Sequence, residues 1–153
     1  MGLATFIGGI HPYEGKELSE DKPIQFIVPE KGEEMVYPLS QHIGAPAKPL
    51  VAKGDQVLKG QIIAEAGGFI SANVLSSVSG TVKGIEPRLV ANGAMVQSII
   101  VENDGEENAI EGFGNARDYT KLSKEEIRNI IKEAGIVGLG GAGFPTHEIG
   151  RAS

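Results

Sequence analysis

Short apolar runs separated by turn-forming residues occupy the middle of the chain and predict a β domain there. Glycine, aspartate and asparagine favour tight turns, and they stand between the runs, as in Lys53-Gly54-Asp55 and Asn92-Gly93. Turns spaced about 8–12 residues apart are typical of a small sandwich or barrel. The expected strands are Met35–Leu39, Pro49–Ala52, Gln56–Leu58, Gln61–Ala64, Val74–Val78, Thr81–Ile85 and Met95–Val101.

The same region contains an internal repeat. Residues 50–57 match residues 89–96, and residues 62–65 match residues 99–102 in a similar register. Each unit has the pattern of strand, turn and strand with one apolar face, and such a face must be buried against another element. The repeat therefore predicts a domain with approximate two-fold symmetry, in which the two units bury each other.

The stretches on either side of this β region have a different character. Residues 1–35 are polar and rich in glycine and proline, which predicts an extended arm with turns, and within it only Ile24–Val28 has the pattern of a strand. Residues 104–122 start with the acidic run Asp104–Asn108 and continue with further turn-forming residues, so we expect an acidic linker.

Residues 123–134 carry the clearest helical pattern in the chain. Ser123 and Glu126 have the spacing of a capping box, and Gly135 is a suitable residue to follow the last helical turn. One stripe of the helix is apolar because its residues recur at i, i+3, i+4 and i+7: Ile127, Ile130, Ile131 and Ala134.

Composition narrows the classes of function. The 153 residues suffice for one domain plus part of another, and a net charge of −6 argues against nucleic-acid binding. The sequence has no cysteine, which excludes a cysteine-ligated cluster within it. No apolar run approaches the roughly 20 residues of a membrane span, and the N-terminus does not have the pattern of a secretory signal. We therefore expect a cytoplasmic protein.

Residues 51–64 and 76–82 resemble biotinyl and lipoyl carrier domains. In that barrel-sandwich hybrid fold, a lysine at a hairpin tip between the two stretches carries the attached group. Here no lysine lies between Lys59 and Lys83, and Phe69 or a neighbour takes the position of the carrier lysine. The resemblance thus implies the fold without attached biotin or lipoate.

A glycine-rich segment, Gly138–Thr146, follows the predicted helix. Closely spaced glycines let backbone N–H groups approach a phosphate or a flat ring. The segment follows a helix and not a strand, and Gly143 is not followed by Lys and Ser or Thr, so neither common nucleotide-binding template fits. A ligand-binding loop and a simple turn between packed elements both remain open.

Four ordered motifs, together with the barrel pattern, resemble the C subunit of the Rnf electron-transport complex: Gly8–Pro12, Pro38–Ala47, Glu102–Gly105 and Gly135–His147. The resemblance implies the peripheral, cytoplasmic electron-input subunit of a membrane-bound, ion-translocating NAD:ferredoxin oxidoreductase. Other subunits of that complex are the implied partners. The implied fold is mainly β with a short α segment. A barrel-sandwich hybrid at 36–103 would be followed at 123–153 by the truncated start of an α/β FMN- and NADH-binding domain.

The resemblance also implies a cofactor site. In the related FMN- and NADH-binding subunit of respiratory complex I, a loop of the Gly-Gly-Ala-Gly-Phe-Pro type lies against FMN. Val137 and Leu139 stand where that loop usually carries arginine, so contact through the backbone is expected. NADH and two [4Fe–4S] clusters would bind elsewhere in the full-length protein, and residues 1–153 alone would be inactive. The FMN-contacting candidates are Gly138, Gly140, Gly141, Gly143 and Phe144.

The remaining expectations concern the histidines and the last segment. His11 and His42 either fix loops by hydrogen bonds, meet the neighbouring nucleotide domain or form a metal pair, and His147 could lie near the flavin. Without their natural partners, residues 136–153 are expected to be poorly ordered or docked against a neighbouring molecule. The alternative function is a non-catalytic module that docks onto partner subunits, with the glycine-rich segment only a turn.

Overall fold

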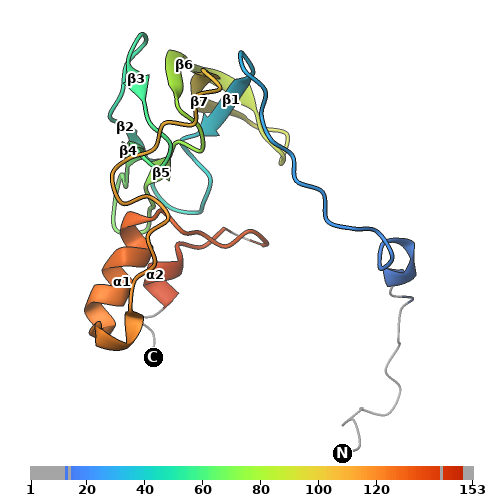
Figure 1. Cartoon of the computed structure of the whole chain (residues 1–153), viewed down its shortest axis with the longest axis vertical. Helices are drawn as coiled ribbons and strands as arrows, with labels where there is room; N and C mark the ends of the chain where they lie inside the picture. The colour runs from blue at the N-terminus through green and yellow to red at the C-terminus, as the bar shows by residue number, and fades with distance from the viewer. Residues whose placement is uncertain (1–12, 14, 142, 150–153) are drawn as a thin grey trace, which may run out of the picture.

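The computed structural model describes residues 13, 15–141 and 143–149, and it is mainly β (Figure 1). Two antiparallel sheets form the body of the molecule. One has four strands in the order β1-β7-β6-β3, and the other has three in the order β2-β4-β5. The strands are β1 (Glu34–Pro38), β2 (Lys48–Pro49), β3 (Gln56–Val57), β4 (Ile62–Glu65), β5 (Val74–Leu75), β6 (Gly80–Leu89) and β7 (Met95–Asn103).

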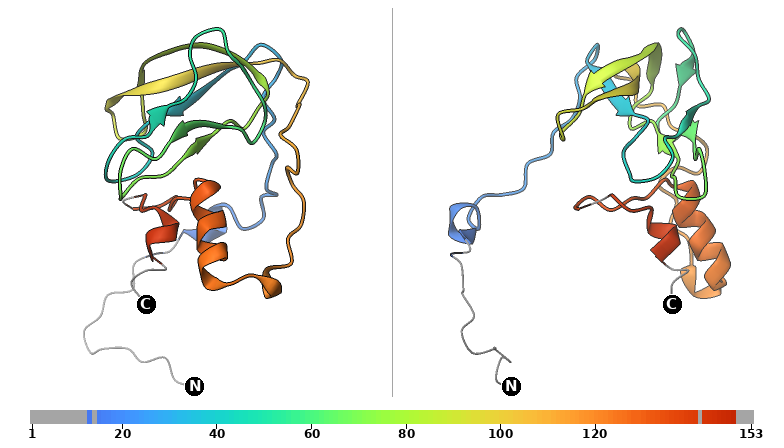
Figure 2. Two further views of the ribbon diagram at one scale, coloured as in Figure 1. Left: turned by 90° about the vertical axis from the view of Figure 1, so that its left-hand side faces the viewer. Right: turned by 180° about the vertical axis from the view of Figure 1, so that it is seen from behind.

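The short helices flank this body. The 3-10 helix η1 (Lys16–Leu18) belongs to the N-terminal arm, and η2 (Tyr119–Lys121) precedes α1 (Lys124–Glu133). The last element is α2 (Thr146–Ile149). Both α-helices lie together at one end of the barrel (Figure 2). No helix in the described part of the chain is long and apolar enough to cross a membrane.

The two sheets enclose one core. Ile63 of β4 and Ile99 and Val101 of β7 are fully buried in it. Fully burying such a side chain contributes about 1.5–3 kcal/mol, so the core stabilises the contact between the sheets. The matched residues 62–65 and 99–102 lie in different sheets, which agrees with the internal repeat.

The turns of the two repeat units also correspond. Gly54 and Gly93 occupy matched positions, and both have positive φ, 97° and 82°. Side chains are strongly disfavoured at such angles, so the sequence match reflects a shared turn requirement.

The predicted strand at Ile24–Val28 is wrong. The segment runs outside the sheets, and among the described residues no hydrogen bond joins it to another strand. Its apolar pattern indicates burial, but the described part of this chain supplies no neighbouring strand to cover it. The arm is held at its base, where the Asn103 side chain donates to the carbonyl oxygens of Pro29 and Glu30 at 3.1 and 3.0 Å.

Residues 104–122 run along the barrel surface. The Ser79 hydroxyl donates to the Asp104 carboxylate at 2.7 Å, and the Asn108 amide donates back to that hydroxyl at 3.0 Å. Further along, a parallel bridge joins Lys59 to Ala109. The segment predicted as a linker is therefore bonded to the barrel along its first half.

The tip of the β4–β5 hairpin supports the C-terminal end of α1. The Asn73 side chain donates to the Glu133 carbonyl at 3.3 Å, and a Cβ at Gly135 would collide with the Asn73 carbonyl oxygen. At the other end of α1, the predicted capping box between Ser123 and Glu126 is present. The capping box thus fixes the start of α1, and contacts with Asn73 of the barrel accompany its end.

Candidate functional site

The glycine-rich segment forms a hairpin, which we call the glycine hairpin (residues 136–141 and 143–146). Val137 and Pro145 pair as an antiparallel bridge, and the Gly138 amide donates to the Phe144 carbonyl at 3.0 Å. The Thr146 amide closes the base by donating to the Ile136 carbonyl at 3.0 Å. Figure 1 shows this hairpin projecting sideways from the α-helical end of the molecule.

The hairpin is seated on the barrel. A Cβ at Gly143 would lie 2.9 Å from the Gln41 carbonyl oxygen and 3.3 Å from the Cα of His42. In the described part of residues 136–153, the hairpin thus packs against the loop at 41–42 of the same chain. Residues 142 and 150–153 lie outside the described residues. That the segment is poorly ordered or docked against a neighbouring molecule stays a prediction.

An open cavity of about 830 Å³ lies between the glycine hairpin and the barrel. Ligand pockets measure roughly 300–1,000 Å³, so its size suits a small molecule. None of the described residues that line it is Asp, Glu, Lys or Arg. The lining comes from the hairpin, β1, the loop after β1, the β5–β6 loop and the β6–β7 turn: Met35, Val36, Tyr37, Pro38, Ser40, Gln41, His42, Ile43, Ser77, Val90, Ala91, Asn92, Gly138, Leu139, Gly140, Gly141 and Gly143.

Four of the five predicted cofactor contacts therefore meet at one cavity: Gly138, Gly140, Gly141 and Gly143. Phe144 is not among the residues that line the cavity. Its carbonyl oxygen accepts the hydrogen bond from the Gly138 amide within the hairpin. Sequence reasoning missed the barrel side of the cavity, of which Tyr37 and Asn92 are examples. The only sequence signal for this side of the cavity is that residues 38–47 carry part of the family resemblance.

The glycines of this hairpin differ in what surrounds them. A Cβ at Gly140 would meet no atom of the residues that the structure describes within 4 Å, and the φ of Gly140 is not in the left-handed region. Packing within the chain therefore does not demand glycine at this position. By contrast, Gly143 has a φ of 61° and the close neighbours described above, so its lack of a side chain is structural.

His42 has a defined structural role. Its Nδ1 lies 2.9 Å from the Ile43 carbonyl oxygen, and its Nε2 accepts a hydrogen bond from the buried Ala72 amide at 3.1 Å. Because Nε2 accepts, the ring proton must be on Nδ1. The ring thereby ties the loop that seats the glycine hairpin to the tip of the β4–β5 hairpin. The loop-fixing role is confirmed for His42, whereas His11 lies outside the described residues.

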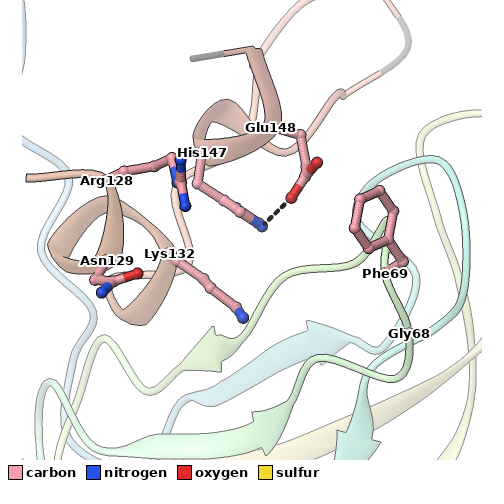
Figure 3. A pocket seen from close by; sticks show the side chains of 7 residues that line it. All are labelled: Gly68, Phe69, Arg128, Asn129, Lys132, His147 and Glu148. Atoms are coloured by element: carbon pink, nitrogen blue, oxygen red, sulfur yellow. Dashed lines mark ion pairs between the residues drawn. The ribbon is translucent and has the colours of Figure 1, made fainter. Parts of the chain in front are cut away.

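A second, smaller hollow of about 150 Å³ is lined by residues of α1, α2 and the tip of the β4–β5 hairpin. Figure 3 shows Arg128 and Lys132 of α1 facing His147 and Glu148 of α2, with Phe69 at the rim. The buried His147 Nε2 lies 3.3 Å from the Glu148 carboxylate. His147 thus lines this smaller hollow. It is not among the residues that line the larger cavity between the glycine hairpin and the barrel.

The tip of the β4–β5 hairpin contains the position that the resemblance to carrier domains assigns to Phe69 or a neighbour. Phe69 sits at the exposed tip of the β4–β5 hairpin. This hairpin tip forms contacts within the molecule. Gly67 packs on the Pro46 carbonyl, and Ser71 donates to the Ala45 carbonyl at 2.8 Å. The tip is therefore a platform for the loop that seats the glycine hairpin.

Metal-ligating side chains do not converge in the described residues, where no group of three or more His, Asp or Glu could hold an ion. Two antiparallel sheets around one core have the architecture of a barrel-sandwich hybrid. Residues 4–106 match the family described as the RnfC barrel sandwich hybrid domain. The chain belongs to this RnfC family.

Three relatives illustrate the match. The chain is 44% identical over 146 residues, 95% of its length, to the C subunit of the proton-translocating ferredoxin:NAD(+) oxidoreductase complex of Clostridium ljungdahlii. It is 44% identical, over 94% of its length, to the C subunit of the Na(+)-translocating complex of Acetobacterium woodii. It is 40% identical, also over 94%, to the C subunit of the ion-translocating oxidoreductase complex of Vibrio cholerae.

The relatives are much longer than this chain. The matched region covers 31% of the C. ljungdahlii protein, 32% of the A. woodii protein and 18% of the V. cholerae protein. Most of each relative therefore lies outside the part to which this chain corresponds.

Proposed function

We propose that this chain is part of the peripheral electron-input subunit of a membrane-bound, ion-translocating NAD:ferredoxin oxidoreductase. Family membership and the names of the relatives support this assignment. The protein would lie on the cytoplasmic face of the membrane, bound to other subunits of the complex. NADH and the iron–sulfur clusters would be bound outside residues 1–153, which contain no cysteine.

Within this protein, we propose that the glycine hairpin begins the FMN- and NADH-binding domain and forms one wall of the flavin site. The observation that carries the proposal is the open space at Gly140, beside a cavity lined by four hairpin glycines. A backbone without Cβ atoms lets a flat ring approach closely. Bound FMN would supply hydride acceptance and one-electron transfer. The uncharged lining suits the ring and leaves charged contacts with the phosphate to the rest of the protein.

Replacing Gly140 by alanine in the full-length protein tests this assignment. Since a Cβ there meets no atom of the described residues within 4 Å, Gly140→Ala should fold normally and lower FMN affinity by at least about tenfold, roughly 1.4 kcal/mol. Fluorescence titration of the flavin-free protein measures this change.

The matched control is Gly84→Ala. Gly84 lies in β6, and a Cβ there likewise meets nothing within 4 Å. We expect it to leave FMN affinity unchanged. Equal affinity for the wild type, Gly140→Ala and Gly84→Ala would show that the hairpin is only a turn.

One observation favours the alternative of an interaction module. Leu139, at the tip of the glycine hairpin, is completely exposed. Such a residue suits a protein contact as well as a ligand contact. If Leu139→Ser weakened binding to partner subunits without changing flavin content, the docking function would be the better assignment.

A further inference from the structure

The N-terminal arm carries an unusual concentration of exposed apolar side chains. Ile24, Phe26 and Ile27 are 92%, 94% and 93% exposed, and Val28 is 65% exposed. Burying one such side chain is worth about 1.5–3 kcal/mol, and contiguous exposed apolar surface marks an interaction site. We call residues 24–28 the apolar strap.

The backbone of the apolar strap is also open. Among the described residues, none donates or accepts a hydrogen bond through the main chain of residues 24–28. An extended segment with free N–H and C=O groups can add as a strand to the edge of a sheet, while its side chains enter pockets. Both the side chains and the backbone of the strap therefore fit a partner with a sheet edge.

The strap leaves the barrel from a fixed point and lies on a defined side of it. Its base is held by Asn103, at the end of β7. Figures 1 and 2 show that the arm and the glycine hairpin project toward the same side of the barrel. A domain that covers the arm would therefore extend toward the glycine hairpin, and the reverse.

The C-terminal elements are incompletely covered as well. The apolar stripe of α1, which includes Ile127 and Ile130, is only half-buried, and Ile136 and Ile149 are exposed. Two relatives are about three times as long as this chain. A full-length protein of that size has enough further residues to cover these surfaces. A body joined to the same polypeptide needs no separate association step, because covalent linkage raises its effective concentration.

We propose that the apolar strap pairs, in extended conformation, with the part of the full-length polypeptide outside residues 1–153. The strap thereby holds that part over the side of the barrel where the glycine hairpin projects. This proposal depends on the length of the full protein and not on flavin binding, so it can fail while the flavin site stands, and the reverse.

Photo-cross-linking from the strap identifies what covers it. In the full-length protein purified alone, Phe26→p-benzoylphenylalanine should give a monomer-sized product in which the probe is joined to a peptide outside residues 1–153. A dimer-sized product would assign the strap to a second copy. Cross-links formed only within residues 1–153, or no cross-link at all, would also overturn the proposal.

Hydrogen exchange on the same isolated protein gives an independent readout. Amides of residues 24–28 should exchange at least ~100-fold more slowly than in an unstructured peptide. Phe26→Glu should abolish this protection, whereas the matched control Gln25→Glu, at a polar position of the strap, should keep it. Fast exchange in the wild-type protein would contradict the proposal.

Discussion

At the scale of the residue, Gly140 and Gly143 lack side chains for different reasons. Gly143 is required by its positive φ and by the loop at 41–42, so its substitution reports on folding. Gly140 has space on the side where a Cβ would stand, so its substitution reports on whatever occupies the cavity. The sequence shows only a run of glycines, and the structure separates the packing glycine from the one that faces open space.

His42 provides a prediction about stability. His42→Ala removes the acceptor for the buried Ala72 amide, and an unsatisfied buried donor costs about 1–3 kcal/mol. We expect the free energy of unfolding to fall by that amount in urea denaturation. The control Gln41→Ala, at the exposed neighbouring side chain, should change it by less than about 0.5 kcal/mol. Equal effects of the two changes would contradict the assigned role.

Asp104 provides a prediction about pH. Hydrogen bonds from the Ser79 hydroxyl and the Glu106 amide, with a smaller effect of Lys31, lower the pKa of the Asp104 carboxyl below its ordinary value of 3.8. Because the folded-state pKa is lowered, its stabilisation is fully present above about pH 4 and is lost as pH falls through the folded-state pKa.

Asp104→Asn should therefore reduce the loss of stability between pH 5 and pH 2, a range of about three units around the ordinary pKa. Thermal unfolding followed across this range measures the effect. The control is Glu111→Gln, which changes an exposed carboxylate of the same segment. An unchanged acid dependence in Asp104→Asn would show that the Ser79 contact does not anchor the segment.

At the scale of the element, short sequence patterns correctly predict the strands and helices whose formation depends on neighbouring residues. The strands around Ile63 and Ile99 and the capped helix at 124–133 are predicted correctly, because burial patterns and caps are encoded within a few residues. The strap at 24–28 is wrongly predicted as a strand, since an apolar pattern encodes burial but does not name the partner. The cavity is half predicted, because its barrel side meets the glycine hairpin only through packing of residues far apart in the sequence.

The capping box of α1 allows a test of an element by itself. Ser123→Ala removes the acceptor for the Glu126 amide and the donor to the Glu126 carboxylate, and loss of such a cap costs about 0.5–2 kcal/mol. We expect faster amide exchange in the first turn of α1. Lys124→Ala, at the exposed neighbouring position, should leave exchange in the helix unchanged. If both variants exchange alike, the cap does not determine where the helix begins.

At the scale of the whole molecule, the barrel supports the glycine hairpin. Its hairpin tip, which in carriers presents a modified lysine, here presents Phe69 and supports the loop that carries His42. That loop positions the glycine hairpin, and the cavity lies between the hairpin and the barrel. The barrel of this chain therefore supports the glycine hairpin that packs on it.

The most direct test of this account is FMN binding by two proteins, residues 1–153 alone and the full-length chain. One wall of a site gives little affinity, because most of a ligand's surface must be buried for tight binding. We predict that fluorescence titration detects FMN binding by the full-length chain and none by residues 1–153. If neither protein binds FMN, the glycine hairpin is not part of a flavin site, and the central claim is wrong.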